Sequence, residues 1–200
     1  MPAQAIDVRG LPPGAFGHRS VMWWGTVGLM LIEGTAFALA IGSYIYLRNR
    51  ATSWPPGFTA PPALFWGTLN TAVLLLSAVP NQLTKRAAER EDLSGTRLWL
   101  TVCLLFGVVF NTLRVYEFRH LNVSWDYNAY GSIVWLLLGL HTTHIVTDVA
   151  DSAVLAALLF IGPVEEIRFV DASENALYWH FVVFTWLPIY AVIYWAPRIW

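Results

Sequence analysis

A few ionisable side chains lie inside long apolar segments, and they are the residues that could do chemistry. Glu33 is the only acidic or basic residue between Val21 and Leu47. The other members of this set are Glu117, His141, His144, Asp148, Asp151 and His180. The four on the fourth segment, from His141 to Asp151, follow spacings of three and four, which places them on one helical face. Because an ionisable group that faces lipid is costly, we expect these side chains to meet one another inside the protein.

Metal or haem binding is one kind of chemistry that these residue types permit. The segment His141-Thr-Thr-His144 puts two imidazoles one turn apart, and Glu33, Glu117 and His180 could add ligands. A carboxylate-bridged di-iron bundle uses two Glu-x-x-His motifs, and this sequence has none. A b-type haem needs two facing histidines, which His180 with either His141 or His144 would supply. The ligand sets are incomplete, so we predict that this chain holds no metal and no haem.

Two further interpretations remain open for the buried polar residues. An isolated buried glutamate suggests a path for protons or ions. Alternatively, the residues form a hydrogen-bonded network that fixes the register of the helices. The residues by themselves favour the network, with proton handling as an addition. No cation lies within one helical turn of Glu33, so we expect it to be neutral and to donate to a carbonyl or hydroxyl of another helix.

The segments that must position these residues are membrane-spanning helices. Of the 200 residues, 56% are hydrophobic and 12% are charged, and a soluble domain carries about twice that charged fraction. The apolar residues form five consecutive blocks, each long enough for a helix that crosses a bilayer. The sequence therefore predicts an all-α polytopic membrane protein, with one five-helix bundle over residues 21–200. The predicted helices cover about 21–47, 63–84, 97–117, 131–162 and 175–197.

The two ends of the bundle differ in their charge. Seven of the 12 basic residues fall on the side of the N-terminus, and the basic tract LTKRAAERED lies there too. Basic loops stay on the cytoplasmic side, which predicts a cytoplasmic N-terminus and a periplasmic C-terminus. Residues 1–20 contain Pro-Pro-Gly and no apolar core, so we expect an irregular arm along the membrane surface. The near-neutral charge and the absence of a basic patch argue against nucleic acid as a partner.

Other features of the blocks predict packing and depth. The stripe Gly34, Ala38 and Gly42 has a spacing of four, which lets a neighbouring backbone approach closely. We therefore expect the first helix to be central to packing, and we assign Asn70 and Thr71 to helix packing as well. The fourth block exceeds the length that the bilayer core requires, so we expect its C-terminal part to project.

Aromatic pairs lie near the ends of the blocks, where such rings prefer the level of the lipid head groups. The pairs are Trp23–Trp24, Phe65–Trp66, Tyr178–Trp179 and Tyr194–Trp195. Arg48, Trp66 and Trp179 are the candidates for contact with lipid head groups. Cys103 is the single cysteine, which excludes an intrachain disulfide and any multi-cysteine metal site.

Five segments in order resemble motifs of the cytochrome c oxidase subunit III family. They read GLMLIEGTAFALAIGSYIYLR, LNTAVLLLSA, VYEF, YGSIVWLLLGLHTTH and ENALYWHFVVFTW. In the family a membrane-embedded Glu is followed fifteen positions later by Arg, and Glu33 and Arg48 keep that spacing. Together the segments extend over nearly the whole chain.

The resemblance implies an accessory, non-redox subunit of a proton-pumping heme-copper terminal oxidase that reduces oxygen to water. By this resemblance the chain packs on catalytic subunit I beside the other oxidase subunits in the bacterial inner membrane, and it binds phospholipid. Haem and copper belong to the partner subunits, so no cofactor is expected in this chain. Glu33, Glu117, His141, His144 and His180 then form an intramembrane polar network or take part in proton uptake.

The sequence departs from the family pattern in three respects. It has five predicted helices where many members have seven. Val183 stands in place of the usual Asp after Tyr-Trp-His-Phe-Val, and Asp148 stands where Gly is expected. Two other functions remain as alternatives, namely an accessory subunit of a nitric oxide reductase and an independent small membrane transporter.

Overall fold

The structure is a computed structural model that describes residues 16–163 and 165–199. Its five long helices are α1 (Val21–Arg50), α2 (Leu64–Ala88), α3 (Leu93–Arg119), α4 (Ala129–Ile161) and α5 (Glu166–Tyr190). A π-helical turn, η3 (Ala191–Trp195), joins α5 to the short α6 (Ala196–Ile199). All five long helices have the length and apolar composition to cross a membrane. The predicted all-helical, five-span fold is confirmed.

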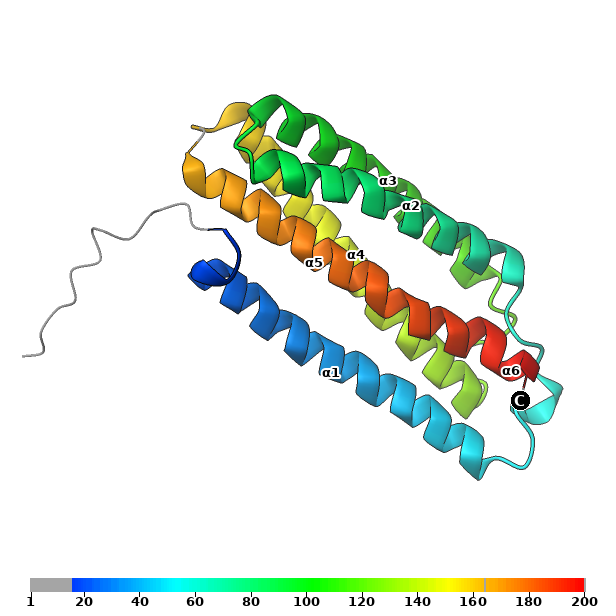
Figure 1. The fold of residues 1–200 in the computed structure, drawn as a ribbon. Coiled ribbons are helices and arrows are strands. Elements are labelled where there is room, and N and C mark those ends of the chain that lie inside the picture. Colours follow the sequence, from blue (N-terminus) through cyan, green and yellow to red (C-terminus); the bar gives the residue numbers. More distant parts are fainter. Residues whose placement is uncertain (1–15, 164, 200) are drawn as a thin grey trace, which may run out of the picture.

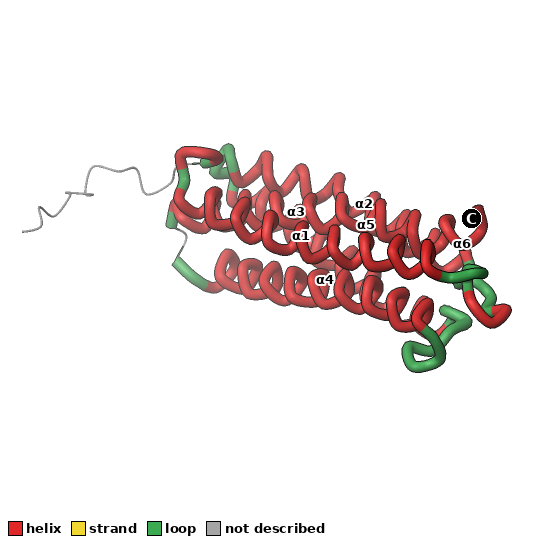
Figure 2. Tube along the Cα trace, turned by 90° about the horizontal axis from the view of Figure 1, so that it is seen from below, coloured by secondary structure: helices red, strands yellow, loops and turns green. Residues whose placement is uncertain are grey.

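Four of the helices form a ring and the fifth lies outside it. Helix α2 packs against α3 and α5, and α4 completes the ring by packing against the same two helices. Helix α1 runs along one side of this ring, against α4 and α5 (Figure 1). All five helices extend along one long axis, with the loops gathered at the two ends (Figure 2).

The expectation that α1 is central to packing is wrong. Only 11% of its most apolar 18-residue window is buried, compared with at least 28% in each other span. Ala38 and Gly42 are exposed, and a Cβ added at Gly42 would meet nothing within 4 Å in the described chain. Gly34 faces only the Phe181 ring, 3.6 Å from such a Cβ. The buried side of α1 instead carries Phe37, Ala40 and Tyr44.

The C-terminal part of α4 packs within the bundle, and its projection beyond the bilayer core remains a prediction. Leu155 and Leu159 are buried in a cluster with Leu100 of α3 and Phe169 of α5. The Arg97 guanidinium donates to the Leu159 carbonyl through Nε at 2.9 Å and Nη2 at 2.5 Å. That carbonyl lies in the last turn of α4, where helix carbonyls lack intrahelical partners, so Arg97 both satisfies and anchors the end.

Local signals set the starts of three helices. The side chains of Ser20, Asp92 and Asn128 accept hydrogen bonds from the first backbone N–H groups of α1, α3 and α4. Such caps replace the missing partners of a helix N-terminus. Helix α5 begins at Glu166 rather than near residue 175, because its first turns are polar and escape a search for apolar blocks. Residues 1–15 of the predicted surface arm lie outside the described residues, and Gly17–Arg19 form one short 3-10 turn.

Candidate functional site

One buried carboxylate lies within the four-helix ring. Glu117 of α3 is 1% exposed and accepts from three directions. Asn70 Nδ2 of α2 donates to its Oε2 at 2.8 Å, and Arg114 Nη1 donates to the same oxygen at 2.9 Å. The hydroxyl of Tyr194 in η3 donates to Oε1. We call these residues, together with His141, the Glu117 cluster.

The guanidinium of Arg114 is held from several sides in the Glu117 cluster. It lies 4.2 Å from the Trp186 ring centroid and 4.6 Å from that of Phe110. His141 Nε2 is 3.1 Å from the Val182 carbonyl, which can only accept, so this nitrogen carries the proton. Its Nδ1 is then an acceptor for Arg114 Nη2 at 3.4 Å. A charge enclosed in this way stabilises the arrangement of α3, α4 and α5.

A glycine makes room for the Tyr194 contact. A Cβ at Gly67 of α2 would lie 2.3 Å from the Tyr194 ring, closer than atoms can approach. The absence of a side chain therefore lets the tyrosine reach across α2 to Glu117. On the same helix, Thr71 Oγ1 accepts from Trp186 Nε1 at 2.8 Å. Asn70 and Thr71 thus both lie between helices and carry polar contacts there.

The second carboxylate, Glu33, lies between α1, α4 and α5. The Tyr178 hydroxyl of α5 donates to Oε2 at 2.7 Å, and His144 Nε2 of α4 is 3.4 Å from Oε1. His144 Nδ1 is 2.7 Å from the Leu140 carbonyl and must donate to it. Its Nε2 is therefore the ring nitrogen that faces the Glu33 carboxyl. Glu33, His144 and Tyr178 are called the Glu33 cluster below.

The Glu33 cluster differs from the expected arrangement. Glu33 does meet a hydroxyl on another helix, but that hydroxyl donates to the carboxyl. The group in position to take a proton from Glu33 is instead the His144 imidazole. Side-chain exposure is 18% for Glu33 and 13% for His144, so neither is fully enclosed. The arrangement can therefore hold a proton and pass it between two titratable side chains.

A cavity of about 540 Å³ opens beside the Glu33 cluster. Its walls come from the N-terminal half of α1, the C-terminal half of α4 and the start of α5. Polar residues of its lining include Glu33, Asp148, Asp151, Asn175 and Tyr178. Asn175 Nδ2 donates to Asp148 Oδ1 at 3.3 Å and to Asp151 Oδ2 at 3.2 Å. Asp148, which occupies the expected glycine position, thus has a partner on α5.

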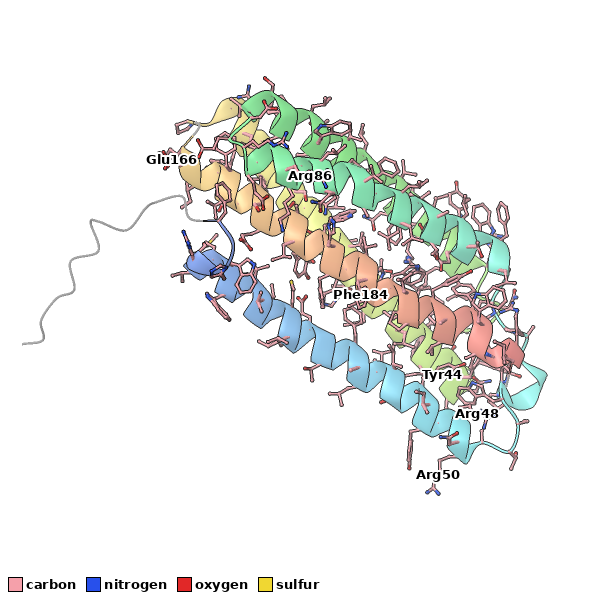
Figure 3. All side chains as sticks on the ribbon, in the orientation of Figure 1. Tyr44, Arg48, Arg50, Arg86, Glu166 and Phe184 are labelled. Atoms are coloured by element: carbon pink, nitrogen blue, oxygen red, sulfur yellow. The ribbon has the colours of Figure 1, made fainter. Side chains whose placement is uncertain are left out.

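The remaining predicted residues fall into separate places. His180 Nδ1 of α5 is 3.0 Å from the Ala176 carbonyl and lies against the Asn81 amide of α2. Arg48 occupies the last turn of α1, and Trp66 stacks on Tyr116 with centroids 5.4 Å apart. Contact of these two residues with lipid head groups remains a prediction. Arg48 and Arg50 lie at one end of the bundle, and Arg86 and Glu166 lie toward the other (Figure 3).

The assignment of Trp179 to the membrane interface is wrong. Trp179 is 1% exposed, and its Nε1 donates to Ser77 Oγ of α2 at 2.9 Å inside the bundle. The interpretation of Tyr194 as an interfacial ring is wrong for the same reason, since it is fully buried. Both rings are held inside by polar partners on other helices, which an aromatic residue near the end of a block does not reveal.

Sequence reasoning missed the tyrosine hydroxyls of the two clusters and the polar start of α5, which lines the cavity. Asp171, Asn175 and Tyr178 follow spacings of four and three, the signature of one helical face. Starting the fifth helix near residue 175 hid this stripe, because Asp171 fell outside the helix. Tyr194 left no comparable signal in the sequence.

Within the described residues, no group of three or more His, Cys, Asp or Glu side chains is arranged to hold a metal ion. The two clusters instead present hydrogen-bonded carboxyl groups inside membrane-spanning helices. A profile of the family described as cytochrome c oxidase subunit III matches residues 22–198. The chain belongs to the cytochrome c oxidase subunit III family.

Individual relatives agree with this assignment. A protein named "Probable cytochrome c oxidase subunit 3" from Mycobacterium bovis is 31% identical over 85% of each chain. Proteins named "Cytochrome c oxidase subunit 3" come from Corynebacterium diphtheriae, 28% identical over 90% of each chain, and from Synechocystis sp.. The Synechocystis protein is 24% identical over 90% of this chain and 78% of its own.

Membership of the subunit III family determines the broad role. The chain is a multi-pass membrane protein and an accessory, non-redox subunit of an oxidase. Its partners are therefore other oxidase subunits.

Proposed function

We propose that this chain is subunit III of a proton-pumping heme-copper terminal oxidase in a bacterial inner membrane. In this proposal it packs on catalytic subunit I, binds phospholipid and supports proton uptake while subunit I reduces oxygen to water. The observation that carries the proposal is the match to the subunit III family over residues 22–198. Haem and copper are held by the partner subunits, and this chain contributes no cofactor.

The charge distribution supports an orientation with the N-terminus in the cytoplasm. Arg114 is paired with Glu117 inside the bundle. It therefore does not act as a loop charge. The last turn of α2 carries Lys85 and Arg86, with Arg90 just after it, and lies at the end of the bundle where α1 begins (Figure 1). This excess of basic residues favours the cytoplasmic side.

The Glu33 cluster supports a role in proton handling. Glu33 and His144 face one another at 3.4 Å, and Glu33 lines a cavity at the N-terminal end of α1. In the proposed orientation this end faces the cytoplasm, from which the oxidase takes up protons. The cluster thus has the groups and the position to exchange protons near the uptake side.

Assembly with an oxidase is tested by co-purification. An affinity-tagged copy of this chain, expressed with its oxidase, is expected to bring down a complex with a haem absorption spectrum. The same chain purified alone is expected to lack a Soret band and bound iron. A stoichiometric Soret band from the isolated chain, or a complex that forms without it at unchanged yield, would contradict the proposal.

Proton handling is tested by Glu33→Gln in the assembled oxidase, reconstituted in vesicles. The variant keeps the side-chain shape, so we expect normal assembly with slower proton uptake during turnover. Glu166→Gln is the matched control, because Glu166 is an exposed acid at the same end of the bundle. Unchanged pumping and turnover in Glu33→Gln would make Glu33 purely structural.

A further inference from the structure

The cavity beside the Glu33 cluster has a strong excess of acidic side chains in its lining. Five carboxyl groups line it, from Glu33 of α1, Asp148 and Asp151 of α4, and Asp171 and Glu174 of α5. Among the described lining residues Arg168 is the one cation, and it is already 3.2 Å from Asp171. His144 faces this region only through Glu33. The cavity therefore favours a positively charged occupant.

Two carboxyl oxygens of the lining have no hydrogen-bond partner among the described residues. They are Asp148 Oδ2 and Glu174 Oε2, on residues that are 2% and 6% exposed. Asn175 occupies only the other oxygen of Asp148, at 3.3 Å. A buried acceptor without a donor is costly, and the great majority of buried polar atoms in proteins are paired. Two such atoms on one cavity indicate a ligand that donates N–H or O–H groups.

The rest of the lining is aliphatic. Met22 and Leu29 of α1 face Val154, Leu155 and Leu158 of α4 across the cavity. These side chains suit a hydrocarbon chain and leave few polar groups for the hydration shell of an inorganic ion. The described residues also offer no three-ligand arrangement for a metal. A ligand with a charged N–H donor at one end matches the unpartnered carboxyl oxygens. An aliphatic chain at its other end matches the aliphatic lining.

We propose that this cavity binds a primary ammonium group that carries an aliphatic chain. The ammonium donates to the unpartnered oxygens of Asp148 and Glu174, and the chain lies along the aliphatic side chains of α1 and α4. An ammonium group has three N–H donors, so it can donate to more than one acceptor of the lining. Such a group can come from a free aliphatic amine or from the head group of an aminolipid. An aminolipid in this site would deepen the proposed phospholipid binding and rests on it, whereas a free amine goes beyond the proposed oxidase function.

Binding is measured with the full chain in nanodiscs of phosphatidylcholine, by calorimetric titration with n-hexylamine at pH 7. Hexyltrimethylammonium is the matched probe, because it has the same chain and charge but no N–H donor. We expect one hexylammonium per chain and at least about tenfold weaker binding of the trimethyl compound, since charge-assisted hydrogen bonds are lost. Equal affinity for the two compounds would overturn the proposal.

Variants locate the site within the cavity. Asp148→Asn combined with Glu174→Gln removes both acids at nearly constant volume and is expected to weaken hexylammonium binding at least about tenfold. Asp126→Asn is the matched control, because Asp126 is exposed in the loop at the opposite end of the bundle. The affinity of this variant for hexylammonium is expected to match that of the unmodified chain.

A second variant keeps the test valid if the double variant fails to fold. Val154→Trp fills the aliphatic side of the cavity without touching an acid, and Val154 is 60% exposed, so folding is expected to persist. It is expected to weaken binding of both amine probes. Unchanged hexylammonium affinity in Val154→Trp, or in a folded double variant, would overturn the proposal.

Lipid competition distinguishes the two sources of the ammonium group. The titration is repeated in nanodiscs that contain phosphatidylethanolamine, whose head group has the N–H donors that phosphatidylcholine lacks. Weaker apparent binding of hexylammonium there would assign the site to the lipid head group. Unchanged binding would assign it to a free amine. Either result retains the ammonium chemistry, whereas the loss of selectivity for N–H donors in both nanodiscs would overturn it.

Discussion

The Glu117 cluster and the Glu33 cluster each place a glutamate between side chains of two other elements, but they differ in enclosure. Glu117 belongs to the four-helix ring, is 1% exposed and accepts from Asn70, Arg114 and Tyr194. Glu33 belongs to the outer helix α1, and its side chain is 18% exposed. Its partners are a hydroxyl and a titratable imidazole, beside a cavity.

The difference shows how position decides what a membrane carboxylate does. Glu117 pairs with the Arg114 guanidinium three residues earlier on α3, and the Asn70 amide of α2 and the Tyr194 hydroxyl of η3 join other elements to this pair. Glu33 lies 3.4 Å from the imidazole of His144 and lines a cavity, which is the arrangement that the proposed proton handling needs. The first cluster is suited to stability and the second to exchange, although both look alike in sequence as isolated glutamates in apolar segments.

Glu117→Gln gives the largest expected effect and tests the structural half of this comparison. The change leaves Arg114 buried without a charged partner, which costs about 3–5 kcal/mol. The free energy of unfolding is measured by titration with sodium dodecyl sulfate in mixed micelles. Glu33→Gln is the matched control on the outer helix and is expected to unfold near the wild-type midpoint. Similar losses for the two variants would contradict the division of roles.

Gly67→Ala tests the same cluster without changing any charge. The added Cβ would lie 2.3 Å from the Tyr194 ring, so the tyrosine must move away from Glu117. Overpacking of this kind costs about 1–3 kcal/mol. The matched control is Gly42→Ala, where the added methyl meets open space and helix propensity improves. If Gly67→Ala is as stable as Gly42→Ala in the same unfolding titration, Tyr194 does not depend on that gap.

The sequence was sufficient to predict the number and type of helices, because each span is a long apolar block. It also identified the polar residues that must avoid lipid, since Glu33, Glu117, His141 and His144 stand out against apolar neighbours. All four contact polar groups on another helix.

The partners of those residues could not be predicted from the sequence. Tyr178 and Tyr194 were interpreted as interfacial rings, since a hydroxyl that reaches across a helix pair leaves no periodic signal. The position of α1 was also mispredicted, because the small-residue stripe Gly34, Ala38 and Gly42 shows where a helix can be approached and not which neighbour approaches it. Pairing across the bundle depends on helix order in space, which the residue pattern of a single helix does not contain.

His144→Phe gives the smallest expected effect and tests the exchange half of the comparison. The replacement keeps a ring against Phe37, whose centroid is 4.8 Å from that of His144. The replacement loses the partly exposed contact with Glu33, and such pairs contribute about 1 kcal/mol or less. It also loses the hydrogen bond from Nδ1 to the Leu140 carbonyl one turn earlier on α4. We therefore expect a near wild-type unfolding midpoint and an unchanged haem spectrum in the assembled oxidase, together with slower proton uptake. His141→Phe is the control for burial, because it removes the acceptor of Arg114 and is expected to destabilise the chain more. A shifted haem spectrum, or a destabilisation as large as that of His141→Phe, would show that His144 supports the bundle and does not serve Glu33 alone.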